Sequence, residues 1–136
     1  MPAKQPALTV DAIVFDDQER LLLIRRKYPP FSGQFALPGG FVEYGETIEA
    51  AARRELLEET GMIALTQHLI GVYSHPDRDP RGHTVSIAFL ITVETNRPIA
   101  SDDAATAEFI ADWKALPLAF DHNKIVADAL KDRKRK

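Results

Sequence analysis

Three glutamates fall close together in a segment that the sequence predicts to be helical. Residues 47–60 contain no glycine or proline, and Gly61 follows at the position where helices commonly end. Glu55, Glu58 and Glu59 stand at positions i, i+3 and i+4, so they share one helix face within an arc of about 100°. Acidic side chains in the last helical turn cost about 0.3–1 kcal/mol each, because the helix dipole is negative there. A helix built only for stability would carry lysine or arginine at these positions.

An acidic face of this kind is typical either of a solvated surface or of a site for a hard divalent cation. Mg²⁺ prefers oxygen ligands and commonly combines a few carboxylates with substrate phosphates. Arg54 adjoins the cluster and could hold one carboxylate in a fixed rotamer through a bidentate bond. The upstream residues 38–40, Pro-Gly-Gly, could bring bare backbone close to the same side chains, or could form a simple turn.

The spacing of these residues resembles the Nudix box, the signature of the Nudix hydrolase family. The box covers residues 40–62 without a departure from the pattern. Its matching positions are Gly40, Glu46, Arg54, Glu55, Leu56, Glu58, Glu59, Gly61 and Met62. The similarity continues on both sides of the box, from about Leu8 to Leu130. It implies one Nudix domain over residues 1–136, with the α/β/α sandwich and mixed β-sheet of that family.

This resemblance implies Mg²⁺- or Mn²⁺-dependent hydrolysis of a nucleoside diphosphate linked to another group. The metal ligands that it implies are the Gly40 carbonyl and the carboxylates of Glu55, Glu58 and Glu59. Glu58 is either a third carboxylate ligand or the group that activates water, while Arg54 and Glu46 complete the catalytic set by orienting the carboxylates. Such a cation neutralises pyrophosphate oxygens and lowers the pKa of a bound water that attacks in line.

The loop over residues 73–83 is similar to the loop that follows the box in ADP-ribose pyrophosphatases, including a proline near Pro76. Residues 118–122 also recur in that branch. The resemblance therefore implies that ADP-ribose and water give AMP and ribose 5-phosphate. Arg78 and Arg81 could bind phosphate or ribose hydroxyls, or could instead form salt bridges within a tight turn.

Other charged residues are candidates outside the box. Arg25 and Arg26 end an apolar strand, so at least one is expected to face the cleft and bind a phosphate, unless both lie at an exposed strand end. Some family members take a catalytic base from a late loop, and Glu108 or Asp103 could serve here. Hard cations prefer oxygen, so the histidines expected to be loop and cap residues rather than ligands are His75, His83 and His122.

Two other functions stay open at this point. A pyrophosphohydrolase that removes damaged nucleoside triphosphates would carry the same box, because the box handles phosphates and metal rather than the base. A sensor that binds ADP-ribose without cleaving it would share similar loops. Such sensors generally have a broken box and an added DNA-binding module, and neither is expected here.

The surrounding pattern predicts a mixed sheet sandwiched by helices. A hairpin of two buried strands is expected over residues 7–25, and Leu56 and Leu57 should both face the sheet. The other expected elements are a short strand at 34–37, a break at 38–40, strands at 63–74, 83–94 and 106–111, and a closing helix from Asp121.

Composition narrows the class of protein. The 136 residues fit one domain, and without cysteine they form no disulfide or thiolate site. The net charge is −3, but the last six residues, 131–136, carry five bases and one acid, which leaves −7 on the rest. We expect this acidic body not to bind nucleic acid and the basic tail to be a solvated helix end. Without an apolar span or signal peptide, a cytoplasmic protein is expected. The resemblance implies a small nucleotide substrate and allows a homodimer.

Overall fold

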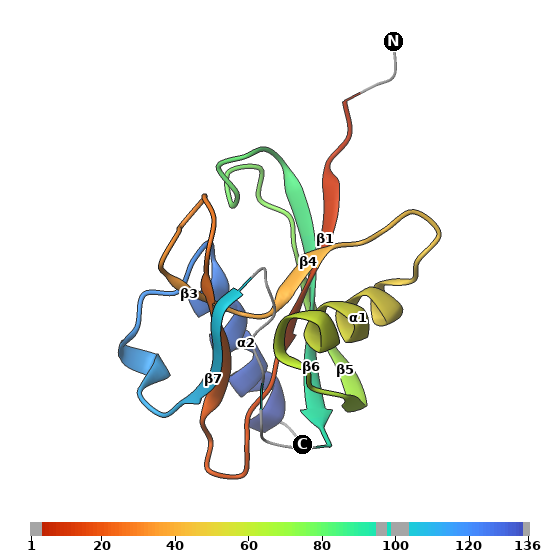
Figure 1. The fold of residues 1–136 in the computed structure, drawn as a ribbon. Helices are drawn as coiled ribbons and strands as arrows, with labels where there is room; N and C mark the ends of the chain where they lie inside the picture. The colour runs from red at the N-terminus through yellow and green to blue at the C-terminus, as the bar shows by residue number, and fades with distance from the viewer. Residues whose placement is uncertain (1–3, 95–97, 99–103, 135–136) are drawn as a thin grey trace.

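The structure of the protein is a computed structural model that describes residues 4–94, 98 and 104–134. Along these residues, four strands precede the first helix, and three strands and a short 3₁₀ turn lie between the first helix and the second (Figure 1). Their bounds are β1 (Ala7–Ile13), β2 (Leu21–Arg26), β3 (Phe35–Ala36), β4 (Gly39–Phe41), α1 (Ile48–Thr60), β5 (Ala64–Tyr73), β6 (Thr84–Val93), β7 (Ala104–Ile110), a 3₁₀ turn (Trp113–Ala115) and α2 (His122–Lys134).

The strands form two sheets. A mixed four-stranded sheet has the order β4-β1-β6-β5, in which β1 runs parallel to β6 and antiparallel to β4. An antiparallel three-stranded sheet has the order β3-β2-β7. Residues 10–13 of β1 and 21–24 of β2 are buried on both faces, which explains why these parts of the strands are mostly apolar.

The two helices cover opposite faces of this β-layer. Side chains that alternate along β1 and β6 face α1 and form one core with Ala51, Ala52 and Leu56. The intervening side chains belong to a second core with Ile125, Val126 and Ala129 of α2. The arrangement is therefore an α/β/α sandwich with a mixed sheet, which confirms the predicted fold class.

The strands between residues 7 and 25 differ from the predicted hairpin. Both strands form and are buried, but they belong to different sheets, and only the bridge between Phe15 and Leu21 joins their ends. The expected break at residues 38–40 is confirmed at Pro38, which lies between β3 and β4, but it is wrong for Gly39 and Gly40, which begin β4 and pair with β1. Gly39 permits this pairing, since a Cβ there would lie 2.1 Å from the carbonyl oxygen of Val10. The remaining expected elements are present with shifted ends.

Helix α1 begins and ends as its sequence predicts. The Thr47 side chain accepts a hydrogen bond from the Ala50 amide at 3.1 Å, and Gly61 ends the helix in the left-handed conformation with φ 71°. Leu56 is fully buried, but Leu57 is 51% exposed, so the expectation that both leucines face the sheet is wrong for Leu57. One residue turns the helix by about 100°, and this rotation carries Leu57 beyond the buried stripe.

The basic C-terminal segment lies partly in α2. Arg133 donates to Glu19 at 2.7 Å and places its guanidinium over the Phe15 ring, while residues 135–136 lie outside the described part. Basic side chains in the last turn of α2 favour the helix dipole. In the described part of the chain, neither helix is long and apolar enough to cross a lipid bilayer.

Candidate active site

The acidic face of α1 lies against β4. The Glu55 side chain is mostly buried at 15% exposure, and its carboxylate packs on Gly40, where a Cβ would lie 2.5 Å from Glu55 Oε2. Glu59 accepts a hydrogen bond from the Gly39 amide at 2.9 Å. Glu58 is more exposed, at 58%. The glycines thus let the backbone of β4 come close to two of the three carboxylates.

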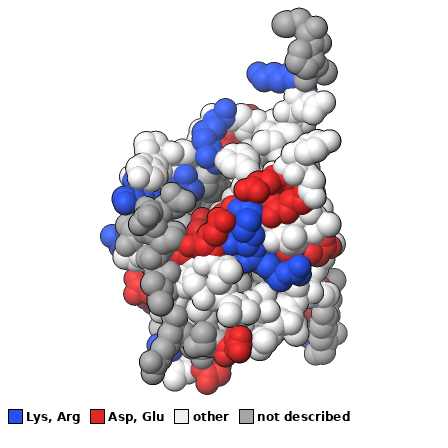
Figure 2. All heavy atoms as spheres, turned by 45° about the vertical axis from the view of Figure 1, so that its right-hand side comes forward, with Lys and Arg blue, Asp and Glu red and all other residues white. Residues whose placement is uncertain are grey.

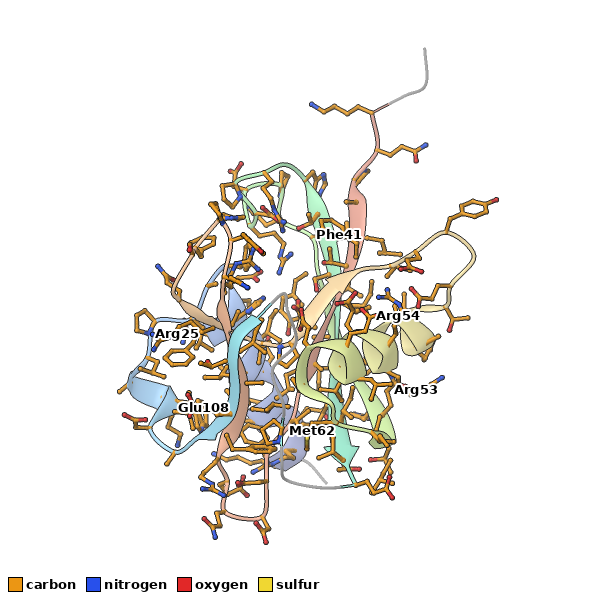
Figure 3. The ribbon with its side chains drawn as sticks, in the orientation of Figure 1. Arg25, Phe41, Arg53, Arg54, Met62 and Glu108 are labelled. Carbon is orange, nitrogen blue, oxygen red and sulfur yellow. The ribbon has the colours of Figure 1, made fainter. Side chains whose placement is uncertain are left out.

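Arg54 joins the members of the cluster. Its Nε and Nη2 donate to both carboxylate oxygens of Glu46 at 2.7 and 2.9 Å. Its Nη1 donates to Glu55 at 2.6 Å and to Glu58 at 3.3 Å, and Nη2 also donates to the Phe41 carbonyl. Figure 3 shows Arg54 directed toward β4, whereas its neighbour Arg53 points away from it. The predicted orienting role of Arg54 agrees with this position at the centre of the carboxylates.

The hydrogen bonds of Arg54 change the pKa values of the residues in this cluster. Hydrogen bonds from Arg54 lower the pKa of Glu46 to about 2, so Glu46 remains ionised at neutral pH. The same bonds raise the pKa of Arg54. Burial raises the pKa of Glu55, although the positive charge of Arg54 opposes this change. On the face of the molecule that includes α1, acidic side chains surround basic ones (Figure 2).

The residues of the acidic face offer the oxygen ligands that a hard divalent cation prefers. Glu55, Glu58 and Glu59 supply carboxylate oxygens, and Gly40 supplies a nearby backbone carbonyl. No three acidic or histidine side chains among the described residues already converge in the geometry of a metal site. Arg54 and the Gly39 amide hold the carboxylates instead. A cation would therefore share Glu55 and Glu58 with Arg54.

A cleft adjoins the acidic face. Glu59, Gly39 and Gly40 line two neighbouring pockets, and Glu55 lines one of them. The other residues shared by both pockets are Ile24, Arg26, Phe41 and Arg81. The cleft thus combines carboxylates with two arginines, which is suitable for a polyphosphate bridged by a cation.

Arg26 and Arg81 stand beside aromatic rings in this cleft. The Arg81 guanidinium lies 5.3 Å from the ring centre of Phe41 and 5.7 Å from that of Phe120, and Asp79 holds it through a bond of 2.7 Å. Arg26 lies 5.0 Å from the Phe120 ring. Burial and the charge of Arg81 lower the pKa of Arg26. The position of both arginines agrees with the predicted contact to phosphate.

Arg78 lies in the same cleft but is engaged inside the protein. Its side chain is only 5% exposed, and it donates twice to Asp121, at 2.9 and 2.6 Å, and once to Thr84. Arg78 therefore ties the loop to Asp121 outside it, whereas the expected alternative of a salt bridge within the turn is formed by Arg81 and Asp79. His75 and His83 also bond within this loop, as expected.

Arg25 and Glu108 lie apart from the acidic face. Arg25 is exposed and stacks over the Phe35 ring at 4.7 Å, so Arg26 alone of this pair lines the cleft. Glu108 pairs with Leu23, whose side chain belongs to the core beneath α2, on the face of the sheet opposite α1. Both lie on the far side from Arg54 in Figure 3. The geometry gives Glu108 no contact with the carboxylates, and Asp103 lies outside the described residues.

The sequence interpretation missed Asp11 and the buried position of His122. Both residues line one pocket of the cleft, and they are 7% and 4% exposed. The signal for Asp11 was an acidic residue inside the apolar run of residues 7–15. His122 was expected to be a cap or loop residue. It begins α2, but its ring faces the interior.

The chain is similar in sequence to known proteins. The family model described as "NUDIX domain" matches residues 5–131. The chain is 55% identical over 127 residues to an ADP-ribose pyrophosphatase of Methanocaldococcus jannaschii, which covers 93% of this chain and 74% of that protein. It is 31% identical to an ADPR-responsive transcriptional repressor, NtrR, of Acinetobacter baylyi, over 91% of this chain but only 53% of the repressor.

Solved structures are similar as well. The NUDIX domain of Shewanella oneidensis NrtR, complexed with ADP-ribose, superposes with a TM-score of 0.88 at 29% identity, covering 96% of this chain and 90% of that one. A bifunctional NMN adenylyltransferase/ADP-ribose pyrophosphatase of Francisella tularensis, complexed with AMP and a manganese ion, gives 0.87 at 33% identity, covering 97% of this chain and 43% of that one.

Proposed function

Because the chain belongs to the NUDIX domain family, we propose that it hydrolyses ADP-ribose to AMP and ribose 5-phosphate with Mg²⁺ or Mn²⁺ as cofactor. The observation that carries this proposal is the acidic face of α1. Arg54 donates hydrogen bonds to Glu55 and Glu58 on this face, and the adjoining cleft is lined by Arg26 and Arg81. The 55% identity to an ADP-ribose pyrophosphatase supports the choice of substrate. The ion in the Francisella structure supports a divalent cation.

The residues of the site have distinct parts in this reaction. Glu55, Glu58, Glu59 and the Gly40 carbonyl would hold the cation. When bound, such a cation neutralises pyrophosphate oxygens and lowers the pKa of water. Arg54 and Glu46 keep the carboxylates in position. Of the two helix carboxylates bonded to Arg54, Glu58 has the more exposed side chain. It is therefore the one that would accept the proton of the attacking water, as the alternative to binding the cation.

The arginines of the cleft bind the substrate in this proposal. Arg26 and Arg81 neutralise phosphate oxygens, and the rings of Phe41 and Phe120 limit the motion of Arg81. Water adds its oxygen to one phosphorus of the bridge, and the bond from that phosphorus to the bridging oxygen breaks. The bridging oxygen leaves on the other phosphate, which takes up a proton.

The test is product analysis with the purified chain. ADP-ribose should give AMP and ribose 5-phosphate, and ¹⁸O-labelled water should mark the phosphate that is attacked. Glu58→Gln and Glu59→Gln should abolish hydrolysis with unchanged circular dichroism. Glu49→Gln is the matched control, because Glu49 lies exposed in the first turn of the same helix.

Two outcomes would replace the proposal. Higher kcat/KM on nucleoside triphosphates than on ADP-ribose would indicate a triphosphate pyrophosphohydrolase. An inactive wild-type chain that binds ADP-ribose tightly would indicate a sensor, as the similarity to NtrR allows. In the second case, titration with duplex DNA would test our expectation that the chain does not bind nucleic acid.

We also propose that the chain forms a homodimer and acts in the cytoplasm. Strand β5 is an edge of the four-stranded sheet, and Leu65, Leu69 and Val72 along it are 62%, 51% and 59% exposed. Exposed apolar side chains on an edge strand favour association with a second chain. Light scattering should give twice the monomer mass, and Leu69→Lys should reduce it to the monomer. Cell fractionation tests the compartment.

A further inference from the structure

A buried polar group lies beneath the cleft, between β1, β6 and α2. His122 Nδ1 accepts a hydrogen bond from the Leu37 amide at 3.0 Å, so the ring proton is on Nε2. His122 Nε2 then donates to Asp11 Oδ1 at 3.3 Å. The hydroxyl of Ser86 donates to the other oxygen of Asp11. The His122 and Asp11 side chains are only 5% and 9% exposed.

These three residues do not form a nucleophilic triad. In such a triad the serine donates to the histidine, whereas Ser86 donates to the aspartate. Ser86 is also completely buried, so substrate has no access to its hydroxyl. Asp11, Ser86 and His122 can therefore affect the site only through the other residues that they contact.

The buried pair of Asp11 and His122 lies beside the backbone of residues 37–40, which leads to the acidic face of α1. The carbonyl of Pro38, next to Leu37, accepts from the Ala12 amide at 2.8 Å. Gly39 then packs against Asp11, where a Cβ would lie 2.7 Å from Asp11 Oδ1. The Gly39 amide donates to Glu59 at 2.9 Å. The segment of residues 37–40 thus lies between the buried pair and the proposed metal ligands.

We propose that His122 and Asp11 are positioning residues for the metal site, because they hold residues 37–40 where the Gly39 amide can orient Glu59. This inference rests on the proposed function, in which Glu59 is a metal ligand. His122 stands 85 residues from Leu37 in the sequence, so this bond also ties α2 to the backbone beside α1. Partners that orient metal ligands typically change metal affinity 10- to 100-fold when they are replaced.

The experiment compares variants of His122 in the full chain. His122→Leu removes both bonds at similar volume. His122→Asn keeps an acceptor near the position of Nδ1 and so preserves the bond from the Leu37 amide. Val126→Ala is the control, because Val126 is buried in the same helix and belongs to the same core as Leu37, but its apolar side chain makes no hydrogen bond to the backbone of residues 37–40. Binding of Mn²⁺ without substrate is followed by electron paramagnetic resonance, together with Tm and amide hydrogen exchange.

We expect His122→Leu to weaken Mn²⁺ binding about tenfold and to speed exchange of the Leu37 and Gly39 amides. His122→Asn should recover most of the affinity. Val126→Ala should lower Tm and leave Mn²⁺ binding as in the wild type. If His122→Leu fails to fold, Asp11→Asn takes its place, since it keeps the shape of Asp11 but removes its charge.

The outcomes separate this inference from the proposed function. A folded His122→Leu variant that binds Mn²⁺ like the wild type, and differs only in Tm as Val126→Ala does, would overturn the positioning role. A wild-type chain that binds no Mn²⁺, or binds it equally well after Glu59→Gln, would overturn the proposed metal site itself.

Discussion

Gly40 offers a direct test of how closely the backbone must approach the carboxylates. In Gly40→Ala, the new Cβ would lie 2.5 Å from Oε2, 2.6 Å from Cδ and 2.8 Å from Oε1 of Glu55. Ordinary contact begins near 3.4 Å, so the carboxylate must move by roughly 1 Å. Only the end of a flexible side chain must yield, and the cost in folding free energy should stay below about 1 kcal/mol.

The same displacement should have a large effect on catalysis. A shift of about 1 Å in a positioned group can cost about 100-fold in rate, which corresponds to about 2.7 kcal/mol in activation free energy. We therefore expect Gly40→Ala to reduce kcat/KM for ADP-ribose about 100-fold and to leave Tm within about 4 °C of the wild type.

Gly39→Ala is the contrasting variant. Its Cβ would lie 2.1 Å from the Val10 carbonyl oxygen, which is backbone of the paired strand and cannot turn away. This variant should lose about 1–3 kcal/mol or more in stability and fail mainly through unfolding. Steady-state kinetics and thermal denaturation of both variants provide the assay. A Gly40→Ala variant with wild-type kcat/KM would refute the argument that the close approach of Gly40 to Glu55 serves catalysis.

Three further predictions concern charge and metal. Arg81→Ala should raise KM for ADP-ribose about tenfold in steady-state kinetics, whereas Arg25→Ala should change it little, because only Arg81 lines the cleft. Since Arg54 lowers the pKa of Glu46 to about 2, the pair stabilises the fold above the ordinary pKa of a glutamate and loses this effect as the pH falls toward 2. The Tm difference between wild type and Glu46→Gln should therefore shrink between about pH 5 and pH 2, and a constant difference would contradict the ion pair. Excess EDTA should abolish hydrolysis, and Mg²⁺ or Mn²⁺ should restore it in the same sample, whereas full activity in EDTA would exclude the proposed cofactor.

Helix α1 could be read from the sequence because its determinants are local. Thr47 and Gly61 mark its ends, and helical periodicity alone brings Glu55, Glu58 and Glu59 to one face. The pairing of Arg54 with two of these carboxylates also follows from their short separation in the chain. Local geometry was insufficient even here for Leu57, because the width of the buried stripe depends on what packs against the helix.

The partners of the strands were decided by the tertiary structure. Residues 7–25 have the pattern of two buried strands, but this pattern does not tell which strand lies beside which. β1 pairs with β6, and this parallel pairing joins residues about 77 apart in the chain, such as Ala7 and Thr84. Pairing with β1 made Gly39 and Gly40 of the Pro38-Gly39-Gly40 segment the start of strand β4.

The sequence by itself determined the chemistry of the acidic face, because residue type and helical spacing settle which carboxylates can act together. Only the tertiary structure decided what surrounds them. It placed Arg26 and Arg81 in the cleft, left Arg25 and Glu108 outside it, and buried Asp11 against His122 across 111 positions of the chain. Contacts between such distant residues depend on the packing of whole elements, and no local pattern of residues encodes that packing.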